Sequence, residues 1–182
     1  MPQRAVLVID LQNEYFPTGK LPLVGIEAAT ANAARVIADA RANGVPVIHV
    51  RHEAAKADAP VFTPGTPNTQ IHTSVAPVEG EAVIVKHFPN SFRETPLKAL
   101  LDEQGVRELV IVGAMSHMCI DAGTRAAADL GYAVTVVHDA CATRDLVFGG
   151  QTVPAAQVHA AFMSALGSSY SRVASTEAVL GQ

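Results

Sequence analysis

Three polar side chains stand at the ends of hydrophobic runs, and their types suit nucleophilic chemistry. Asp10 directly follows one such run, Lys86 follows a second, and Cys119 lies just past a third. The runs occupy 5–9, 82–85 and 109–113. If they form parallel strands of an α/β sheet, their carboxyl ends lie on one edge, where such folds bind their ligands. A carboxylate, an ammonium and a thiol brought together there predict a nucleophilic site.

Cys119 stands where a helix is predicted to begin. Ser116 is a natural N-cap, which places Cys119 third in the first helical turn. The positive end of a helix lowers the pKa of a thiol, and its free amides can hold an oxyanion. The competing interpretation is a small buried hydrophobe, a frequent role of unpaired cysteine. No helix start accompanies Cys141, so we expect it to be packed, although its reactivity stays open.

Asp10 and Lys86 each carry a charge into apolar surroundings. Asp10 lies between Ile9 and Leu11, where an unpaired carboxylate is costly. It therefore needs a cationic partner or a raised pKa, and either suits a general base that takes the thiol proton. In isolation Asp10 could be a loop-start cap and Lys86 a strand-end lysine that reaches solvent. The three residues together favour the catalytic interpretation.

The elements that position these residues alternate between strand and helix. Because the strands are continuously apolar, we expect a sheet buried on both faces. The predicted fold is α/β: a three-layer α/β/α, doubly wound, mainly parallel six-stranded sheet of Rossmann-like type. The expected strands are 4–9, 45–50, 83–86, 108–113, 132–138 and 171–174, and the expected helices are 26–42, 94–104, 117–130 and 154–166.

Two segments, 51–81 and 139–153, lack helical or strand periodicity. Loops of such length in a compact domain are usually functional, and both leave the edge that carries the three polar residues. We expect them to wall a pocket. No Gly/Ser-rich or Pro-rich hinge divides the chain, so we expect a single domain over 1–182.

The composition excludes several classes of partner. The net charge is −4, from 13 basic and 17 acidic residues without a basic cluster, which argues against nucleic acid and anionic membranes. Two cysteines are too few for a disulfide framework, and their spacing is not that of a zinc site. The first apolar run is too short for a signal peptide or a membrane span. We therefore expect a cytoplasmic protein with a small-molecule substrate.

The order and spacing of five segments resemble the isochorismatase-like cysteine hydrolases, a superfamily that includes nicotinamidases and carbamoylsarcosine-type amidohydrolases. The segments are VIDLQNEYF at 8–16, KHFPNSF at 86–92, GAMSHMCID at 113–121, RAAADLGY at 125–132 and DACATRD at 139–145.

The resemblance implies a catalytic triad of Asp10, Lys86 and Cys119. It also implies a cis peptide bond between Ala114 and Met115, with the amides of Met115 and Cys119 forming an oxyanion hole. The implied reaction is hydrolysis of an amide or ureide C–N bond through a thioester, with Asp10 as the base. Isochorismatases proper lack this thiol, so Cys119 favours C–N cleavage.

Further residues are weaker candidates for substrate binding. His117 is close enough in sequence to compete with Asp10 as a base, but the resemblance makes it a pocket-wall or capping residue. Core packing or turn chemistry is the alternative for several of the others. The expected substrate-binding residues are Gln12, Phe16, Phe92, Ala114, His117 and Phe148.

Nicotinamidases of this superfamily carry an Asp-x-His…His metal cluster after the second strand. Here His52, Glu53 and the later His72 could in principle hold Zn²⁺, but the Asp-x-His order is missing. We therefore expect no metal and no cofactor, and a pyridine carboxamide becomes a less favoured substrate.

Other function classes require residues that this chain lacks. A dinucleotide-binding module needs a Gly-x-Gly-x-x-Gly turn after the first strand, and a receiver-like domain needs an acidic residue where Lys86 stands. The serious rival is a catalytically silent family member that acts as an oligomeric scaffold. The resemblance implies a dimer or larger homo-oligomer, with 139–153 and helix 154–166 as the expected contact region and His159 and Phe162 as contact candidates.

Overall fold

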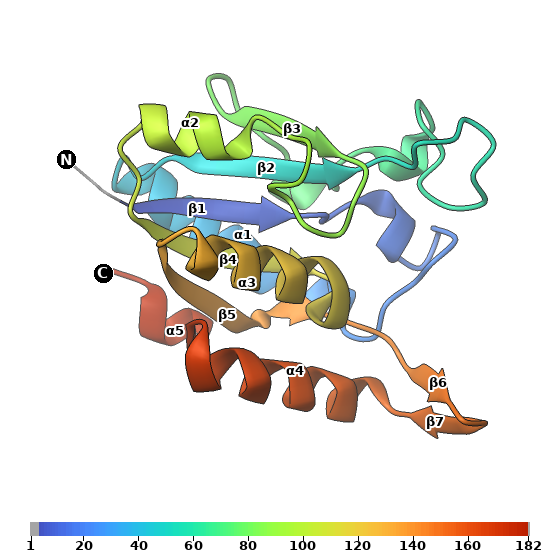
Figure 1. The fold of residues 1–182 in the computed structure, drawn as a ribbon. Helices are drawn as coiled ribbons and strands as arrows, with labels where there is room; N and C mark the ends of the chain where they lie inside the picture. Colours follow the sequence, from blue (N-terminus) through green and yellow to red (C-terminus); the bar gives the residue numbers. More distant parts are fainter. Residues whose placement is uncertain (1–3, 182) are drawn as a thin grey trace.

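The computed structural model describes residues 4–181, and its centre is a six-stranded parallel sheet (Figure 1). The strand order is β3-β2-β1-β4-β5-β8, and every neighbouring pair runs parallel. The predicted six-stranded α/β sheet is thus confirmed. The strands are β1 Arg4–Ile9, β2 Val47–His52, β3 Ala82–Lys86, β4 Glu108–Ala114, β5 Ala133–Ala142 and β8 Arg172–Ala174.

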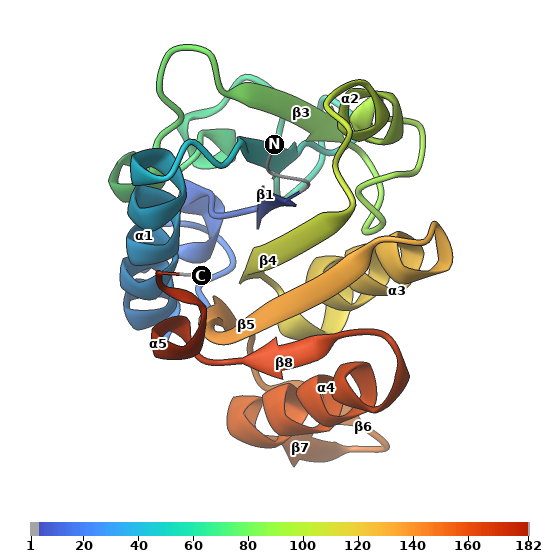
Figure 2. The ribbon, with the colours of Figure 1, turned by 90° about the vertical axis from the view of Figure 1, so that its left-hand side faces the viewer.

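Helices cover both faces of the sheet. Seen from its end, α1 and α5 lie on one face and α2, α3 and α4 on the other (Figure 2). Side chains of β1 alternate between the two resulting cores: Val6 and Val8 join the first, Leu7 and Ile9 the second. This burial on both faces explains the continuously apolar strands. The helices are α1 Ile26–Ala42, α2 Leu97–Glu103, α3 Asp121–Asp129, α4 Ala155–Ser169 and α5 Thr176–Val179.

The segment 139–153 was predicted to be an irregular loop, but the structure forms strands within it. β5 continues to Ala142, and a two-stranded hairpin follows, formed by β6 Leu146–Phe148 and β7 Gln151–Val153. Gly149 and Gly150 form its turn with φ of 58° and 76°, the left-handed values that a two-residue hairpin turn needs. The hairpin projects from the carboxyl edge of the sheet (Figure 1).

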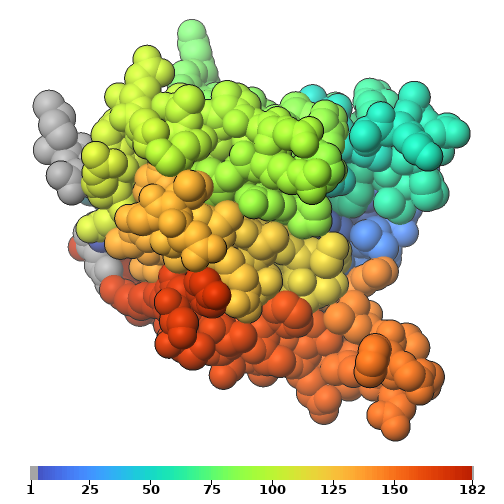
Figure 3. All heavy atoms as spheres, in the orientation of Figure 1, coloured from blue at the N-terminus to red at the C-terminus, as the bar shows by residue number. Residues whose placement is uncertain are grey.

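The segment 51–81 agrees more closely with the predicted lack of regular structure. Beyond the end of β2 it contains two short 3-10 turns, Pro67–Thr69 and Thr73–Val75, and a single bridge from Ile71 to Gln12. A space-filling view shows its atoms at the same end of the molecule as the hairpin (Figure 3). Both segments therefore lie at the end of the molecule where the parallel strands end.

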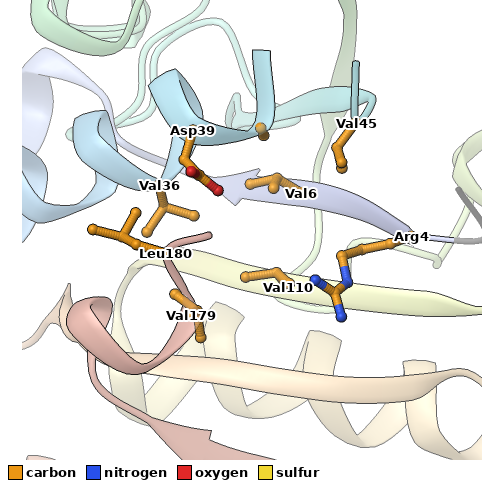
Figure 4. Close-up of a pocket in the computed structure, with 9 residues that line it drawn as sticks. Arg4, Val6, Val36, Asp39, Val45, Val110, Val179 and Leu180 are labelled. Carbon is orange, nitrogen blue, oxygen red and sulfur yellow. The ribbon is translucent and has the colours of Figure 1, made fainter. Parts of the chain in front are cut away.

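A cavity of about 20 Å³, room for one water molecule, lies elsewhere, in the half of the sheet where the strands begin. Figure 4 shows it between α1, α5 and the early residues of β1 and β4, lined mainly by valines. It is a packing gap between helix and sheet.

Within the described residues, no helix has the length and apolar character to cross a bilayer.

Gly113 permits the closest backbone approach at the carboxyl edge. Its φ is 134°, and a Cβ added there would lie 1.9 Å from the Ile9 carbonyl oxygen. The β4–β5 register also shifts between Ile111 and Gly113. Because β1 and β4 would have to separate directly before Asp10, a side chain at this position conflicts with the fold.

We expect Gly113→Ala to lower the free energy of unfolding by more than about 4 kcal/mol, measured by urea denaturation. Gly44→Ala is the matched control: φ is 65°, and among the described residues an added Cβ meets no atom within 4 Å. Backbone strain alone at Gly44 should cost about 1 kcal/mol. Equal losses at the two positions would contradict the argument from the contact with Ile9.

Candidate active site

The structure brings Asp10, Lys86 and Cys119 together at the carboxyl edge. Lys86 Nζ lies 2.8 Å from Asp10 Oδ2 and donates a hydrogen bond of 3.2 Å to Cys119 Sγ. Asp10 and Lys86 are completely buried, and Cys119 is 6% exposed. Three side chains from separate strand ends thus form one buried, hydrogen-bonded group.

Asp10 is turned into this group by an unusual backbone conformation. Its φ is 53°, in the left-handed region. The amide of Asp10 still donates to Val50 in β2, while its carbonyl accepts from the Gln12 amide. Asp tolerates this region better than most residues, and such conformations cluster at functional sites. The turn ends β1 and directs the carboxylate toward Lys86.

The charges of the group keep Lys86 protonated. Burial lowers the pKa of Lys86, but the negative charge of Asp10 acts against it, and the net pKa is raised. Tyr15 is buried beside the same group: burial and then the charge of Asp10 raise its pKa. Lys86 is therefore an ammonium in the resting site.

The prediction of a lowered thiol pKa at Cys119 was wrong for the resting site. Burial and the negative charge of Asp10 raise the pKa of Cys119, and the nearby Lys86 opposes them only in part. The sulfur therefore carries its proton at rest, with a proton acceptor beside it.

Ser116 is not the N-cap that the sequence predicted. The cap position is Met115, without a side-chain cap bond, and Ser116–Ile120 form a π-helical turn before α3. The buried Ser116 hydroxyl lies 2.8 Å from His159 Nδ1 and donates to the Ala142 carbonyl over 3.3 Å. Contacts with β5 and α4 draw the side chain inward and away from the helix start.

The peptide bond between Ala114 and Met115 is cis.

Some expected substrate-binding residues lie near the site. Ala114 is buried at the end of β4, one residue before Met115. His117 is half-buried on the π-helical turn, with Nδ1 2.6 Å from Thr143 Oγ1. Phe16 is buried and stacks on the His72 ring at 3.8 Å between centroids.

Three other candidates have their contacts elsewhere in the structure. Gln12 is fully buried, and its amide bonds to backbone groups of 51–81 rather than facing a cavity. Phe92 stacks on Tyr132 at 6.1 Å and packs on the core under α2 and α3. Phe148 is 86% exposed near the hairpin tip.

The three residues considered for a metal are engaged separately. His52 Nδ1 lies 3.2 Å from Lys86 Nζ, Glu53 pairs with Arg51 at 2.8 Å, and His72 Nδ1 lies 2.7 Å from Ser74 Oγ. Between residues 4 and 181 the structure contains no group of three His, Cys, Asp or Glu side chains arranged for a metal ion.

Sequence reasoning missed the contact between His52 and Lys86. The predicted second strand ended at Val50, but β2 runs to His52, and its register places His52 opposite Lys86 on β3. Extending the strand by two residues would have put a fourth polar side chain on the same edge. That was the available signal.

Comparisons with known proteins show which family the chain is similar to. Residues 4–178 match the family model of the isochorismatase domain. The chain is 52% identical over 176 residues to YddQ, an uncharacterised isochorismatase family protein of Bacillus subtilis, covering 97% of this chain and 98% of that protein. It is 37% identical over 174 residues to a streptothricin hydrolase of Streptomyces noursei, covering 90% of this chain and 59% of the relative. An isochorismatase-hydrolase crystal structure from Oleispira antarctica has a TM-score of 0.95 at 57% identity, covering 98% of this chain and 96% of that one.

Proposed function

The chain belongs to the isochorismatase family, and from this we propose that it is a cysteine-dependent hydrolase that cleaves the C–N bond of a small amide or ureide. The observation that carries the proposal is the contact of Lys86 Nζ with both Asp10 Oδ2 (2.8 Å) and Cys119 Sγ (3.2 Å). A nucleophile with a base and a cation beside it is the arrangement that covalent catalysis requires.

In the proposed reaction Asp10 takes the proton of the Cys119 thiol as the sulfur attacks the substrate carbonyl carbon. Lys86 stabilises the developing thiolate, and the amides of Met115 and Cys119 hold the oxyanion of the tetrahedral intermediate. When the intermediate collapses, the C–N bond breaks and Asp10 returns its proton to the leaving nitrogen. A thioester remains on Cys119. Asp10 then deprotonates a water molecule that attacks the thioester, releasing the acid and restoring the thiol.

The raised pKa of Cys119 fits this sequence of events. A thiol protonated at rest has to lose its proton during attack, and a neighbouring carboxylate supplies the acceptor at the moment it is needed. Only 6% of Cys119 is exposed, which favours a substrate that offers a narrow group, such as a primary carboxamide, to the sulfur. The relative named a streptothricin hydrolase supports hydrolysis as the type of reaction.

An ammonia-release screen across small carboxamides and ureides tests the proposal. Turnover that is absent from a Cys119→Ala blank supports it. A protein that turns over none of the compounds, and whose Cys119 forms no thioester detectable by mass spectrometry, would instead favour the silent scaffold.

We also propose that the protein is a homo-oligomer, assembled through the β6–β7 hairpin. Val147 and Phe148 are 73% and 86% exposed on this projecting hairpin, and apolar side chains so displayed mark interaction surfaces. The two contact candidates on α4 also have partners within the protomer: His159 Nδ1 lies 2.8 Å from Ser116 Oγ, and Phe162 packs edge-on against His117 at 6.1 Å.

Light scattering should give a dimer mass or larger for the wild type, and Phe148→Ser should shift the mass toward the monomer because it removes the largest exposed apolar side chain. Val24→Ser, at a 60% exposed apolar residue outside the hairpin, is the control. A wild-type monomer mass at every concentration would exclude this assembly.

A further inference from the structure

Lys86 has more hydrogen-bonding capacity than the three-residue group uses. An ammonium has three N–H donors; the ion pair with Asp10 Oδ2 engages one, and the hydrogen bond to Cys119 Sγ engages another. Lys86 is fully buried, so an unused donor would lose its bond to water without replacement. The third acceptor within reach is His52 Nδ1, 3.2 Å from Nζ.

We propose that His52 is a positioning residue for Lys86: its Nδ1 accepts the third ammonium proton and thereby fixes the other two on Asp10 and Cys119. This inference rests on the proposed function and extends it to a fourth side chain. Three acceptors satisfy all three N–H donors, so any rotation of the ammonium breaks hydrogen bonds, whereas two acceptors leave one buried N–H without a partner. His52 then acts on catalysis through Lys86, without contact with the substrate.

The charge state of His52 agrees with this role. A ring nitrogen that accepts from an ammonium must hold a lone pair, so the imidazole is neutral and its proton is on Nε2. Burial, followed by the positive charge of Lys86, lowers the pKa of His52 to about 4. An imidazole is neutral above its pKa, so Nδ1 of His52 remains an acceptor at neutral pH.

The surroundings of His52 hold its ring in place. The Gln12 side chain bonds both backbone groups of His52: Oε1 accepts from the amide and Nε2 donates to the carbonyl, each over 2.8 Å. The ring packs edge-on against Phe62 at 5.1 Å and 84°. Phe62 is itself held by Glu14 Oε2, which accepts its amide proton over 2.8 Å. Gln12, expected to bind substrate, therefore supports the residue that orients Lys86.

Substitutions of different hydrogen-bonding capacity test the proposal kinetically, with an amide turned over by the wild type. His52→Leu keeps the bulk but removes the acceptor, and we expect kcat to fall about 10- to 100-fold with KM changed less than about threefold. His52→Asn places an oxygen near the position of Nδ1 and should recover most of kcat. The control is His87→Asn, since His87 is exposed and its ring contacts the Glu53 carbonyl instead. Equal kcat in the Leu and Asn variants, or a loss confined to KM, would overturn the proposal.

A measurement without substrate separates this inference from the proposed function. In ¹⁵N-labelled wild type, long-range ¹H–¹⁵N spectra should show His52 as the Nε2–H tautomer, neutral from pH 8 to about pH 5. Lys86→Met should change the Nδ1 shift of His52, because the donor is lost. A His52 that titrates near 6.5, carries its proton on Nδ1, or ignores Lys86→Met would refute the positioning role even if the enzyme hydrolyses amides. The expected spectra together with no amide turnover would leave the contact standing and remove the proposed function.

Discussion

Cys119→Ala should reduce the rate of ammonia release by at least about three orders of magnitude, because removal of a covalent nucleophile removes the acyl-enzyme route. The loss should be in kcat. The Asp10–Lys86 ion pair, at 2.8 Å, does not depend on the sulfur, so thermal unfolding should change little. Cys119→Ser should be nearly as inactive, since a hydroxyl gives up its proton far less readily than a thiol.

The second cysteine provides the matched control. Cys141 is buried on β5, and burial raises its pKa to about 12, although a backbone hydrogen bond from Gly113 opposes this. It has neither the lysine nor the carboxylate that Cys119 has beside it. Cys141→Ala should retain activity within about threefold. If Cys141→Ala abolishes turnover and Cys119→Ala does not, the wrong sulfur was assigned.

The parts of the fold that the sequence predicted well have local causes. β1 and α1 were predicted to the residue because a continuous apolar run stops at Asp10, and an alanine-rich helix stops at Asn43-Gly44. Gly44 has φ of 65°, the left-handed value that ends helices. The carboxylate, ammonium and thiol also followed from local pattern, because parallel strands place their ends on one edge.

The parts that were missed depend on contacts between distant segments. Glu14 is buried and ties down 51–81 by accepting the Phe62 amide proton, a contact between residues 48 apart in the chain. Ser116 looks like a helix cap in its own segment, but His159, 43 residues later, turns it inward. No periodicity or turn signal encodes either contact, so a single sequence could not supply them.

The raised pKa of Cys119 is a third case of this kind. The expected helix-dipole effect is local, whereas burial and the charge of Asp10 come from the assembled fold, and these two dominate. The prediction of a reactive thiol therefore took account of the helix start but not of burial or of the charge that Asp10 brings to the sulfur. The consequence is that Asp10 and Lys86 must be considered as one unit with the sulfur.

Lys86→Met should be the most destabilising of the site substitutions. It leaves the Asp10 carboxylate fully buried without its cation, and breaking a buried ion pair from one side costs about 3–5 kcal/mol. Activity should also be lost, since the thiolate has no other cation within hydrogen-bond distance in the described site. Lys98→Met is the control, because Lys98 pairs with Asp102 at 2.6 Å on the surface, where solvent screens the charges and the pair contributes little to stability.

The double variant Asp10→Asn with Lys86→Met separates folding from catalysis. Asn tolerates the left-handed conformation at position 10 and removes the stranded charge, so most of the lost free energy of unfolding should return. Turnover should stay absent, because neither a base nor a cation remains. Urea denaturation measures the first effect and ammonia release the second. If Lys86→Met loses no more free energy of unfolding than Lys98→Met, the buried pair is not the structural centre of this site. If the double variant regains activity, the pair is not its catalytic centre. Stability that recovers without activity is the result expected of a charge pair retained for catalysis.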